Sequence, residues 1–288
     1  MSKRVLVVND IPGAGKVAAN INIPILSAGG MEVSVLPTMF VSTQTGESYS
    51  NIIRHEMNED FRRTLDVWKN NDIHFDVILT GYFSTIEQLE LFTEYYLQEK
   101  VRNPEMKLLM DPIMADNGKY YPGFDHRIAE KFSALMKQAD IVFPNITEAC
   151  FITNTPYSEL MTVEELNQVS LKLIESGVQY VVITGVRVPE SNPNQIGFYV
   201  RGQNDYNRLI MHKYYPEHFF GTGDIVVSSA TVWFSRGYSI EDTLLKTGKI
   251  IEQSLDNTLA LNRDIKWGIY FEPILNQFFP INDKERSF

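Results

Sequence analysis

The sequence predicts an α/β fold in which a central, mostly parallel sheet is covered by helices on both faces. Short β-branched apolar runs alternate with longer segments of helical periodicity, which is the pattern of βαβ units. Several runs are almost continuously apolar, as expected of strands that are covered on both sides. Late in the chain the alternation stops and two strand candidates flank a short polar turn, which predicts a small β-hairpin.

Six segments have the composition of strands in such a sheet. In chain order they are Val5–Val8, Glu32–Leu36, Asp76–Thr80, Lys107–Asp111, Ile141–Phe143 and Tyr180–Thr184. Between them lie segments in which apolar residues recur at helical spacing. The expected helices are Lys16–Ser27, Asn51–Asn70, Ile86–Lys100, Asp125–Gln138 and Val163–Ser176.

The last third of the chain holds the hairpin and two long helices. Ile196–Arg201 and Arg208–His212 flank the turn-forming residues 202–205, which predicts two antiparallel strands. Asp224–Ser235 and Ile240–Leu261 then have the length and periodicity of helices. No linker-like stretch or shift of composition marks a boundary, so we expect one domain over residues 1–288.

The composition excludes several classes of protein. A formal net charge of −10 argues against a nucleic-acid partner, because binding a phosphate backbone needs a basic surface. No stretch reaches the roughly 18 apolar residues of a membrane span, and the apolar run at residues 5–8 is too short for a signal peptide. A single cysteine rules out an internal disulfide, and the histidines lack zinc-ligand spacing. We therefore expect a cytoplasmic protein with small-molecule partners.

A glycine-rich segment after the first strand suggests two nucleotide-binding motifs that its spacing excludes. Residues 12–16 read PGAGK, but a P-loop needs Gly and Ser or Thr where this chain has Asp10 and Val17. A dinucleotide-binding fingerprint needs an acidic residue at the end of the second strand, which here ends in the residues LPT. The segment is therefore either a flexible turn or a substrate-binding turn at the carboxyl end of a strand.

The strongest functional signal is the segment Gly221-Thr222-Gly223-Asp224, which directly precedes a predicted helix. Glycines allow a close approach of the backbone, and the first amides of a helix stabilise the charge on a transferring phosphoryl group. Asp224 is placed to accept a proton from an attacking hydroxyl group. The residues alone leave an alternative open, in which Asp224 is only a first-turn acid that favours the helix dipole.

The order of several motifs resembles the ribokinase superfamily, in particular its pyridoxal and hydroxymethylpyrimidine kinase branch. Residues 221–224 match the Gly-Thr-Gly-Asp element of that branch without a gap. Residues 111–116 (DPIMAD) resemble its acidic DPVMGD segment, and residues 144–148 (PNITE) resemble its PNxxE element. The resemblance implies a ribokinase-like three-layer α/β/α fold, transfer of a phosphoryl group from ATP, a requirement for Mg²⁺, and a homodimer.

The same resemblance implies roles for individual residues. The catalytic group consists of Asp224 as the base with Gly221, Thr222 and Gly223 as the anion hole. The nucleotide-binding group consists of Asp111, Asp116, Asn145, Glu148 and Thr184, of which Asp116, Asn145 and Glu148 are also expected to act on Mg²⁺, partly through water. Each element also has a purely structural interpretation, as a strand end at 111–112, a turn at 116–118 and a helix cap at 145–148.

The substrate is inferred from a third set of similarities. The resemblance implies that Asp10 contacts the polar edge of a pyridine ring, that Thr45 of the segment STQTG reaches the same ring, and that Tyr82 of the segment TGYFS covers one ring face. We therefore expect a kinase that phosphorylates the 5′-hydroxymethyl group of a B6 vitamer. The alternatives are a hydroxymethylpyrimidine or sugar kinase, and a non-catalytic protein that binds a vitamer or a nucleotide.

Overall fold

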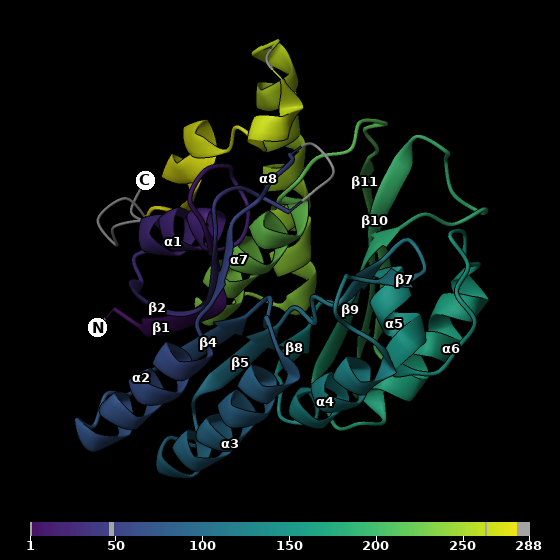
Figure 1. The fold of residues 1–288 in the computed structure, drawn as a ribbon. Coiled ribbons are helices and arrows are strands. Elements are labelled where there is room, and N and C mark those ends of the chain that lie inside the picture. The colour runs from purple at the N-terminus through teal and green to yellow at the C-terminus, as the bar shows by residue number, and fades with distance from the viewer. Residues whose placement is uncertain (1, 46–48, 263, 281–288) are drawn as a thin grey trace, which may run out of the picture.

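The computed structural model describes residues 2–45, 49–262 and 264–280. Nine of its strands form one sheet: β1 (Arg4–Pro12), β2 (Glu32–Val41), β3 (Arg54–Glu56), β4 (Val77–Thr80), β5 (Lys107–Met110), β8 (Ile141–Val142), β9 (Tyr180–Val186), β10 (Gln195–Gly202) and β11 (Asn207–Lys213). Their order is β11-β10-β9-β8-β5-β4-β1-β2-β3 within these ranges (Figure 1). The six strands from β9 to β2 are parallel, and β3, β10 and β11 pair antiparallel at the edges. The predicted α/β sheet and late hairpin are confirmed.

Helices cover both faces of the sheet, as Figure 1 shows. They are α1 (Ala19–Ala28), α2 (Asn58–Asn70), α3 (Ile86–Arg102), α4 (His126–Met136), α5 (Ile146–Ile152), α6 (Val163–Ile174), α7 (Thr222–Ser235) and α8 (Ile240–Ala260), followed by the 3₁₀ turns η1 (Ile265–Trp267) and η2 (Glu272–Phe278). α1, α7 and α8 lie on one face, and α2 to α6 lie on the other. None of the described helices is long and apolar enough to cross a membrane.

Each face of the sheet has its own apolar core, because side chains alternate along a strand. In β1 the side chains of Val5 and Val7 enter the core beneath α1 and α7, whereas Leu6 and Val8 enter the core beneath α2 to α5. All four are fully buried. This double burial explains the continuous apolar run that predicted an interior strand.

Two predicted boundaries were wrong around the second strand. β2 continues through Pro37 to Val41, since Pro37 lies opposite Asn9, where the register of β1 shifts and no regular ladder hydrogen bond is required. The helix predicted from Asn51 begins at Asn58, because residues 54–56 pair with the extended end of β2 as β3. The local sequence pattern does not contain this pairing between strands, which prevents residues 54–56 from joining the helix that their spacing predicts.

The helix predicted from Lys16 also begins later, at Ala19. Gly15 and Ala18 have positive φ angles of 101° and 50°, so the chain between them forms a loop and no helical turn. Lys16 in this loop instead makes a parallel bridge with Gly268, beyond η1. Loop 13–18 thus joins the end of β1 to α1 and contacts the C-terminal segment.

A small antiparallel pair, β6 (Ala115–Asp116) and β7 (Lys119–Tyr120), was not predicted as strands. The turn between them was predicted, and Asn117 and Gly118 have the positive φ angles of 50° and 72° that such a tight turn requires. The pair carries the acidic segment beyond the carboxyl edge of β5.

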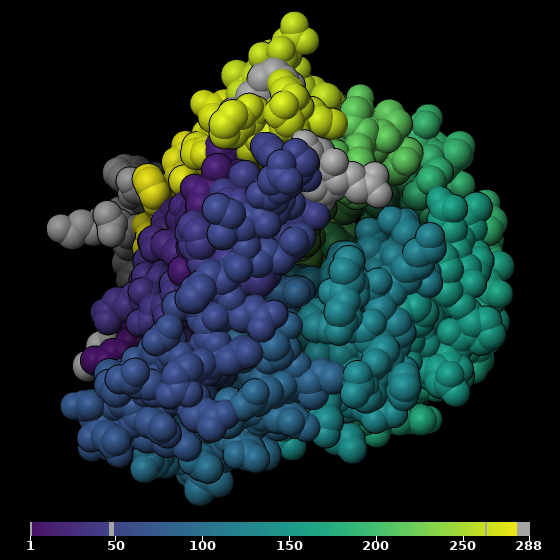
Figure 2. Space-filling view, in the orientation of Figure 1, coloured from purple at the N-terminus to yellow at the C-terminus, as the bar shows by residue number. Residues whose placement is uncertain are grey.

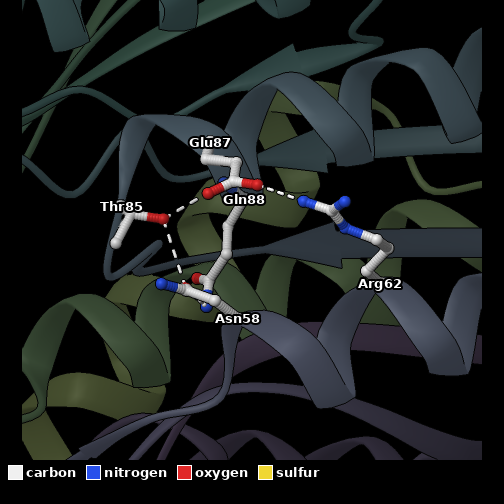
Figure 3. Close-up of polar contacts among 5 residues, drawn as sticks. All are labelled: Asn58, Arg62, Thr85, Glu87 and Gln88. Atoms are coloured by element: carbon white, nitrogen blue, oxygen red, sulfur yellow. Dashed lines mark hydrogen bonds and ion pairs between the residues drawn. The ribbon is translucent and has the colours of Figure 1, made fainter.

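The turn after β4 is held by polar contacts between α2 and α3 (Figure 3). Thr85 caps α3, and its hydroxyl donates to Asn58 Oδ1 at 3.3 Å. The buried Gln88 donates to the same oxygen at 2.8 Å and to Thr38 O at 2.8 Å, while Arg62 and Glu87 form an ion pair at the surface. These contacts fix the path of residues 81–84, which lead from the sheet edge into α3.

Candidate functional site

The predicted anion hole lies at the N-terminus of α7, which begins at Thr222. Gly221 is the N-cap with a left-handed φ of 91°, and a Cβ there would lie 2.5 Å from both Lys16 O and Ile21 Cδ1. Only glycine therefore fits between loop 13–18 and α1. The amides of Thr222 and Gly223 precede the first intrahelical donor, Ile225, and so face the sheet edge without a helical acceptor. This geometry suits an anion.

Asp224 lies in the first turn of α7 and points toward loop 13–18. Its Oδ2 accepts a hydrogen bond of 2.8 Å from the backbone N–H of Ala18, and Asn9 Nδ2 lies 3.5 Å from its Oδ1. Burial raises the pKa of Asp224 to about 6, while the hydrogen bonds from Ala18 and Asn9 oppose the rise. Within the described ranges Asp224 makes no ion pair. A carboxylate with this pKa is ionised at neutral pH yet basic enough to accept a proton.

Asp10 lies near Asp224, and Tyr82 lies near Asp10. Burial, followed by the charge of Asp224, raises the pKa of Asp10 to about 7. Burial, followed by the charge of Asp10, raises the pKa of Tyr82 to about 12. The Tyr82 ring lies 5.7 Å from the ring of Phe124, at an interplanar angle of 41°. The structure thus brings the Asp10 carboxyl group near Asp224 and near the ring of Tyr82. The contacts that the sequence predicts between these two residues and a substrate ring stay predictions.

Asp111 follows β5 and approaches the N-terminus of α7 from the neighbouring strand. A Cβ on Gly223 would lie 3.7 Å from Asp111 Oδ2. Burial raises the pKa of the Asp111 carboxyl well above its usual value, and the charges of Glu148 and Asp224 raise it further. The carboxyl group makes no hydrogen bond with another described residue, which leaves its oxygen atoms available for a cation or a phosphate-bound water.

Asn145 and Glu148 form the capping box of α5. Asn145 Oδ1 accepts from Glu148 N and Glu148 Oε2 accepts from Asn145 N, each at 2.9 Å. The remaining groups reach the acidic segment, where Glu148 Oε1 accepts from Met114 N at 3.1 Å and Asn145 Nδ2 donates to Ala115 O at 2.8 Å. Burial raises the pKa of Glu148 to about 8. The two residues therefore hold residues 114–115 in place, so the structural interpretation of this motif is satisfied.

Asp116 and Thr184 lie at the same edge of the sheet. Both oxygen atoms of Asp116 accept from Asn117, at 2.9 and 3.1 Å. Thr184 makes a parallel bridge with Asn145, and its N–H donates to Pro144 O at 2.9 Å. Asn145 and Thr184 thus belong to one edge of the sheet.

Oxygen atoms dominate the donors that gather here, as Mg²⁺ prefers. No group of three or more His, Cys, Asp or Glu side chains in the described ranges is close enough to ligate a metal by itself. Mg²⁺ commonly binds one or two carboxylates and completes its shell with water and substrate phosphates. The carboxyl group of Asp111, which makes no hydrogen bond with a described residue, and the nearby carboxyl group of Glu148 suit this way of binding Mg²⁺.

Tyr121 adds a residue that sequence reasoning did not assign. Burial raises the pKa of its hydroxyl above the usual range, and the charges of Glu148, Asp116, Asp111 and Asp224 raise it further. All four acids therefore act on the one hydroxyl group of Tyr121, which indicates that they surround a common space. In the space-filling view the surface is hollowed between the β2–β3 segment and the teal segment around β7, with green atoms of later residues at the base (Figure 2).

The predicted substrate contact of Thr45 stays a prediction. Thr45 is exposed, and Gly46 of the same motif lies outside the described residues. The preceding Gln44 is buried instead, and its amide donates to Lys266 O at 3.4 Å. The C-terminal segment also contacts loop 13–18, where Lys16 pairs with Glu272 and lies over the rings of Tyr270 and Phe271. Such contacts, more than 200 residues apart in sequence, have no local signal.

Comparison with known proteins finds kinases that act on small molecules. A family model described as phosphomethylpyrimidine kinase matches residues 31–267. A Bacteroides thetaiotaomicron protein assigned to the phosphomethylpyrimidine kinases, in an orthorhombic crystal form with pyridoxal, superposes with a TM-score of 0.90 and 30% identity over 98% of each chain. The pyridoxal kinase of Lactobacillus plantarum superposes with a TM-score of 0.88 and 27% identity over 96% of each chain.

Two curated relatives match a smaller part of their own length. The pyridoxal kinase of Dictyostelium discoideum is 28% identical over 172 residues, which are 55% of this chain and 54% of that protein. The chloroplastic thiamine biosynthetic bifunctional enzyme of Arabidopsis thaliana is 24% identical over 217 residues, which are 75% of this chain and 39% of that protein. Because the family model spans most of the chain, the chain belongs to the phosphomethylpyrimidine kinase family, a family of phosphotransferases that act on a hydroxyl group.

Proposed function

We propose that the protein is an ATP-dependent kinase that phosphorylates the 5′-hydroxymethyl group of a B6 vitamer, in salvage of pyridoxal 5′-phosphate. The observation that carries the proposal is the Asp224 carboxylate, which lies at the N-terminus of α7 without a cationic partner in the described chain and has a pKa of about 6. A base of this kind suits deprotonation of an alcohol as it attacks phosphorus.

In the proposed reaction the substrate oxygen attacks the γ-phosphorus of ATP and its proton passes to Asp224. The bond between the γ-phosphorus and the bridging oxygen breaks, and ADP leaves with that oxygen. The amides of Thr222 and Gly223 stabilise charge on the moving phosphoryl group. Asp111, with Asp116, Asn145 and Glu148, would hold Mg²⁺ in part through water, and the ion would neutralise phosphate charge when bound.

The aromatic wall supports a flat ring as the acceptor. The ring of Tyr82 lies 5.7 Å from that of Phe124 and within the influence of the Asp10 carboxyl group. The pKa of Asp10 is raised to about 7, so this carboxyl group can exchange a proton with a polar ring edge near neutrality. A sugar would need more hydrogen-bonding groups and less aromatic surface. The Bacteroides protein of the same fold was crystallised with pyridoxal, which supports the same ring class.

A second candidate is phosphorylation of a hydroxymethylpyrimidine by the same machinery. The family model and the match to a thiamine biosynthetic enzyme favour it. A pyrimidine is also flat, so Tyr82 and Phe124 suit both rings.

The experiment that tests the proposal measures ADP release, and the phosphorylated product by mass spectrometry, with ATP, Mg²⁺ and a panel of acceptors. We expect the highest kcat/KM for one of pyridoxal, pyridoxamine or pyridoxine. A higher kcat/KM for hydroxymethylpyrimidine would establish the second candidate. Tight binding of a vitamer without ADP release for any acceptor would establish a non-catalytic binding protein and refute both kinases.

A further inference from the structure

Three buried polar side chains form a hydrogen-bonded row that leads to Asp224. Asn9 at the end of β1 is 2% exposed, and Asn22 on α1 and Ser228 on α7 are both 0% exposed. A buried amide is unfavourable unless its donors and acceptors are all paired. The row therefore needs an explanation beyond packing.

Hydrogen bonds connect the row from one helix to the other. Asn22 Nδ2 donates to Ser228 Oγ at 2.8 Å, and Asn22 Oδ1 accepts from Asn9 Nδ2 at 2.9 Å. The same Asn9 Nδ2 lies 3.5 Å from Asp224 Oδ1, a long contact of the kind that shortens when a substrate binds. The row thus ends at the carboxylate proposed as the base.

The direction of the row follows from the backbone. Asn9 Oδ1 accepts from the backbone N–H groups of Asp10 and Tyr82, each at 3.0 Å. Backbone N–H groups can only donate, so the oxygen of the Asn9 amide must face them and its nitrogen must face Asp224 and Asn22. Gly81 leaves room for this amide, because a Cβ there would lie 2.6 Å from Asn9 Nδ2.

We propose that Asn9 and Asn22 are positioning residues for Asp224: the amide of Asn9, oriented by Asn22 and Ser228, presents an N–H to Oδ1 while the Ala18 N–H holds Oδ2. The proposal deepens the proposed function and rests on it for the role of Asp224. The same Asn9 amide also accepts hydrogen bonds from the backbone of Asp10 and Tyr82, the residues on the predicted substrate side. Asn9 would therefore connect the substrate side of the site with the base.

The surroundings of Asp224 show why neutral donors are needed. The titratable groups whose charges act with that of Asp224 are Asp10 on β1, Asp111 after β5 and Tyr121 after β7, and all three are acids. Asp10 and Asp111, when ionised, disfavour an ionised Asp224, whereas the neutral hydroxyl group of Tyr121 does not. The hydrogen bonds from Ala18 and Asn9 oppose burial and keep the pKa of Asp224 near 6.

The test replaces Asn22, which is one residue removed from Asp224 along the row. With saturating vitamer, Asn22→Leu is expected to lower kcat by about 10-fold and leave KM for ATP within about 2-fold, as for a misplaced reacting group. The pKa of Asp224, followed by ¹³C NMR of its carboxyl carbon, is expected to rise. Ser228→Ala, at the far end of the row, should change both quantities in the same direction and by less.

The matched control is Asn103→Leu. Asn103 is also a part-buried amide, but it donates to Phe75 O at 3.2 Å at the opposite end of the sheet, so kcat and the pKa of Asp224 should not change. An Asn22→Leu protein with wild-type melting temperature, kcat and Asp224 pKa would overturn the proposal. An Asn22→Leu protein in which only the KM for ATP changes would also overturn the proposal. If Asn22→Leu does not fold, an unchanged Asp224 pKa in Ser228→Ala overturns it.

Failure of the proposed function has a different signature. A wild-type protein that transfers no phosphoryl group to any acceptor refutes the kinase. The carboxyl pKa of Asp224 can still be measured in that protein, and a rise in Asn22→Leu but not in Asn103→Leu would support the positioning of Asp224 independently of turnover.

Discussion

At the scale of single residues, the site is built from carboxyl groups that burial holds close to neutral pH. The pKa of Asp224 is raised to about 6 and that of Asp10 to about 7, and the charge of Asp224 contributes to the rise at Asp10. Such groups cluster at functional sites, because a group that exchanges protons near neutrality is also costly to bury. Burial of these carboxyl groups should therefore lower the stability of the folded protein and raise its rate of turnover.

Asp10→Asn should therefore stabilise the protein at pH 8 and have no stabilising effect at pH 3.5. The folded-state pKa of about 7 exceeds the usual value of 3.8, so folding favours the protonated carboxyl group and wild-type stability falls as pH rises through this window. Asparagine keeps the shape and cannot ionise. Thermal melting of both proteins across this range checks the prediction, and equal melting temperatures at pH 8 would contradict it.

The dependence of turnover on pH has the opposite sign. Asp224 must be ionised to accept a proton, so kcat/KM should be lost as pH falls through about 6. Asp10, with a pKa of about 7, is mostly protonated at this pH, so Asp10→Asn should leave the acid limb close to its wild-type position. A pH profile of kcat/KM for the acceptor measures the limb in both proteins, and a limb that moves by a full pH unit in Asp10→Asn would contradict this order of ionisation.

Individual site residues were predictable from sequence where a motif carries them. Asp224, Asp111, Asn145 and Glu148 each follow a strand or open a helix in a recognisable order, and the structure brings them to one edge. Asn9, Asn22 and Tyr121 were not assigned, since a buried asparagine in a strand or helix has no local pattern. Only the approach of α1 to α7 reveals what Asn22 contacts.

At the scale of elements, the site depends on how closely loop 13–18 approaches the start of α7. Gly221 makes the approach possible through its positive φ and its missing Cβ. Through this contact the Ala18 N–H reaches Asp224.

Gly221→Ala should destabilise the protein by about 1 to 2 kcal/mol for the left-handed backbone and by a further 1 to 3 kcal/mol, roughly, for the close contact. Gly237→Ala is the matched control, because Gly237 has a φ of 84° with no atom within 4 Å of the added Cβ. Gly237→Ala should therefore lose only the stability that the left-handed backbone conformation costs an alanine. Chemical denaturation measures both changes, and equal losses for the two variants would show that the close approach does not matter.

The boundaries of elements were less predictable than their existence. The parallel strands were all found from composition, but the end of β2 and the start of α2 were misjudged, because pairing between β2 and β3 decides both. β6 and β7 are two residues each and exist only because they pair with each other. Short antiparallel pairs of this kind depend on tertiary context more than on propensity.

At the scale of the whole molecule, the site unites elements from both faces of the sheet. Asp10 lies in β1 and Asp111 follows β5 of the parallel sheet, Glu148 belongs to α5 on one face, and Asp224 belongs to α7 on the other. A ligand bound at this edge would therefore contact both layers, and its binding should stabilise the entire fold. That the chain forms one domain, and that it dimerises, stay predictions.

ATP with Mg²⁺ should accordingly raise the melting temperature. A ligand at about 100 times its Kd adds about 2.7 kcal/mol to the stability of the folded state. Removing Mg²⁺ with EDTA should abolish most of the increase, and Asp111→Asn should weaken the dependence on Mg²⁺ at constant ATP. Thermal shift assays with and without EDTA measure both effects, and an increase that is insensitive to EDTA would contradict the assignment of the cation to this edge.

The most direct test of the account is single-turnover transfer of the labelled γ-phosphoryl group of ATP to the best acceptor. Asp224→Asn should slow the transfer step by about 100-fold or more while ATP binding stays near wild type, which is the scale for losing a general base. Asp242→Asn, which changes an aspartate in the first turn of α8, controls for helix-dipole effects and should transfer at the wild-type rate. Wild-type transfer by Asp224→Asn would contradict the account.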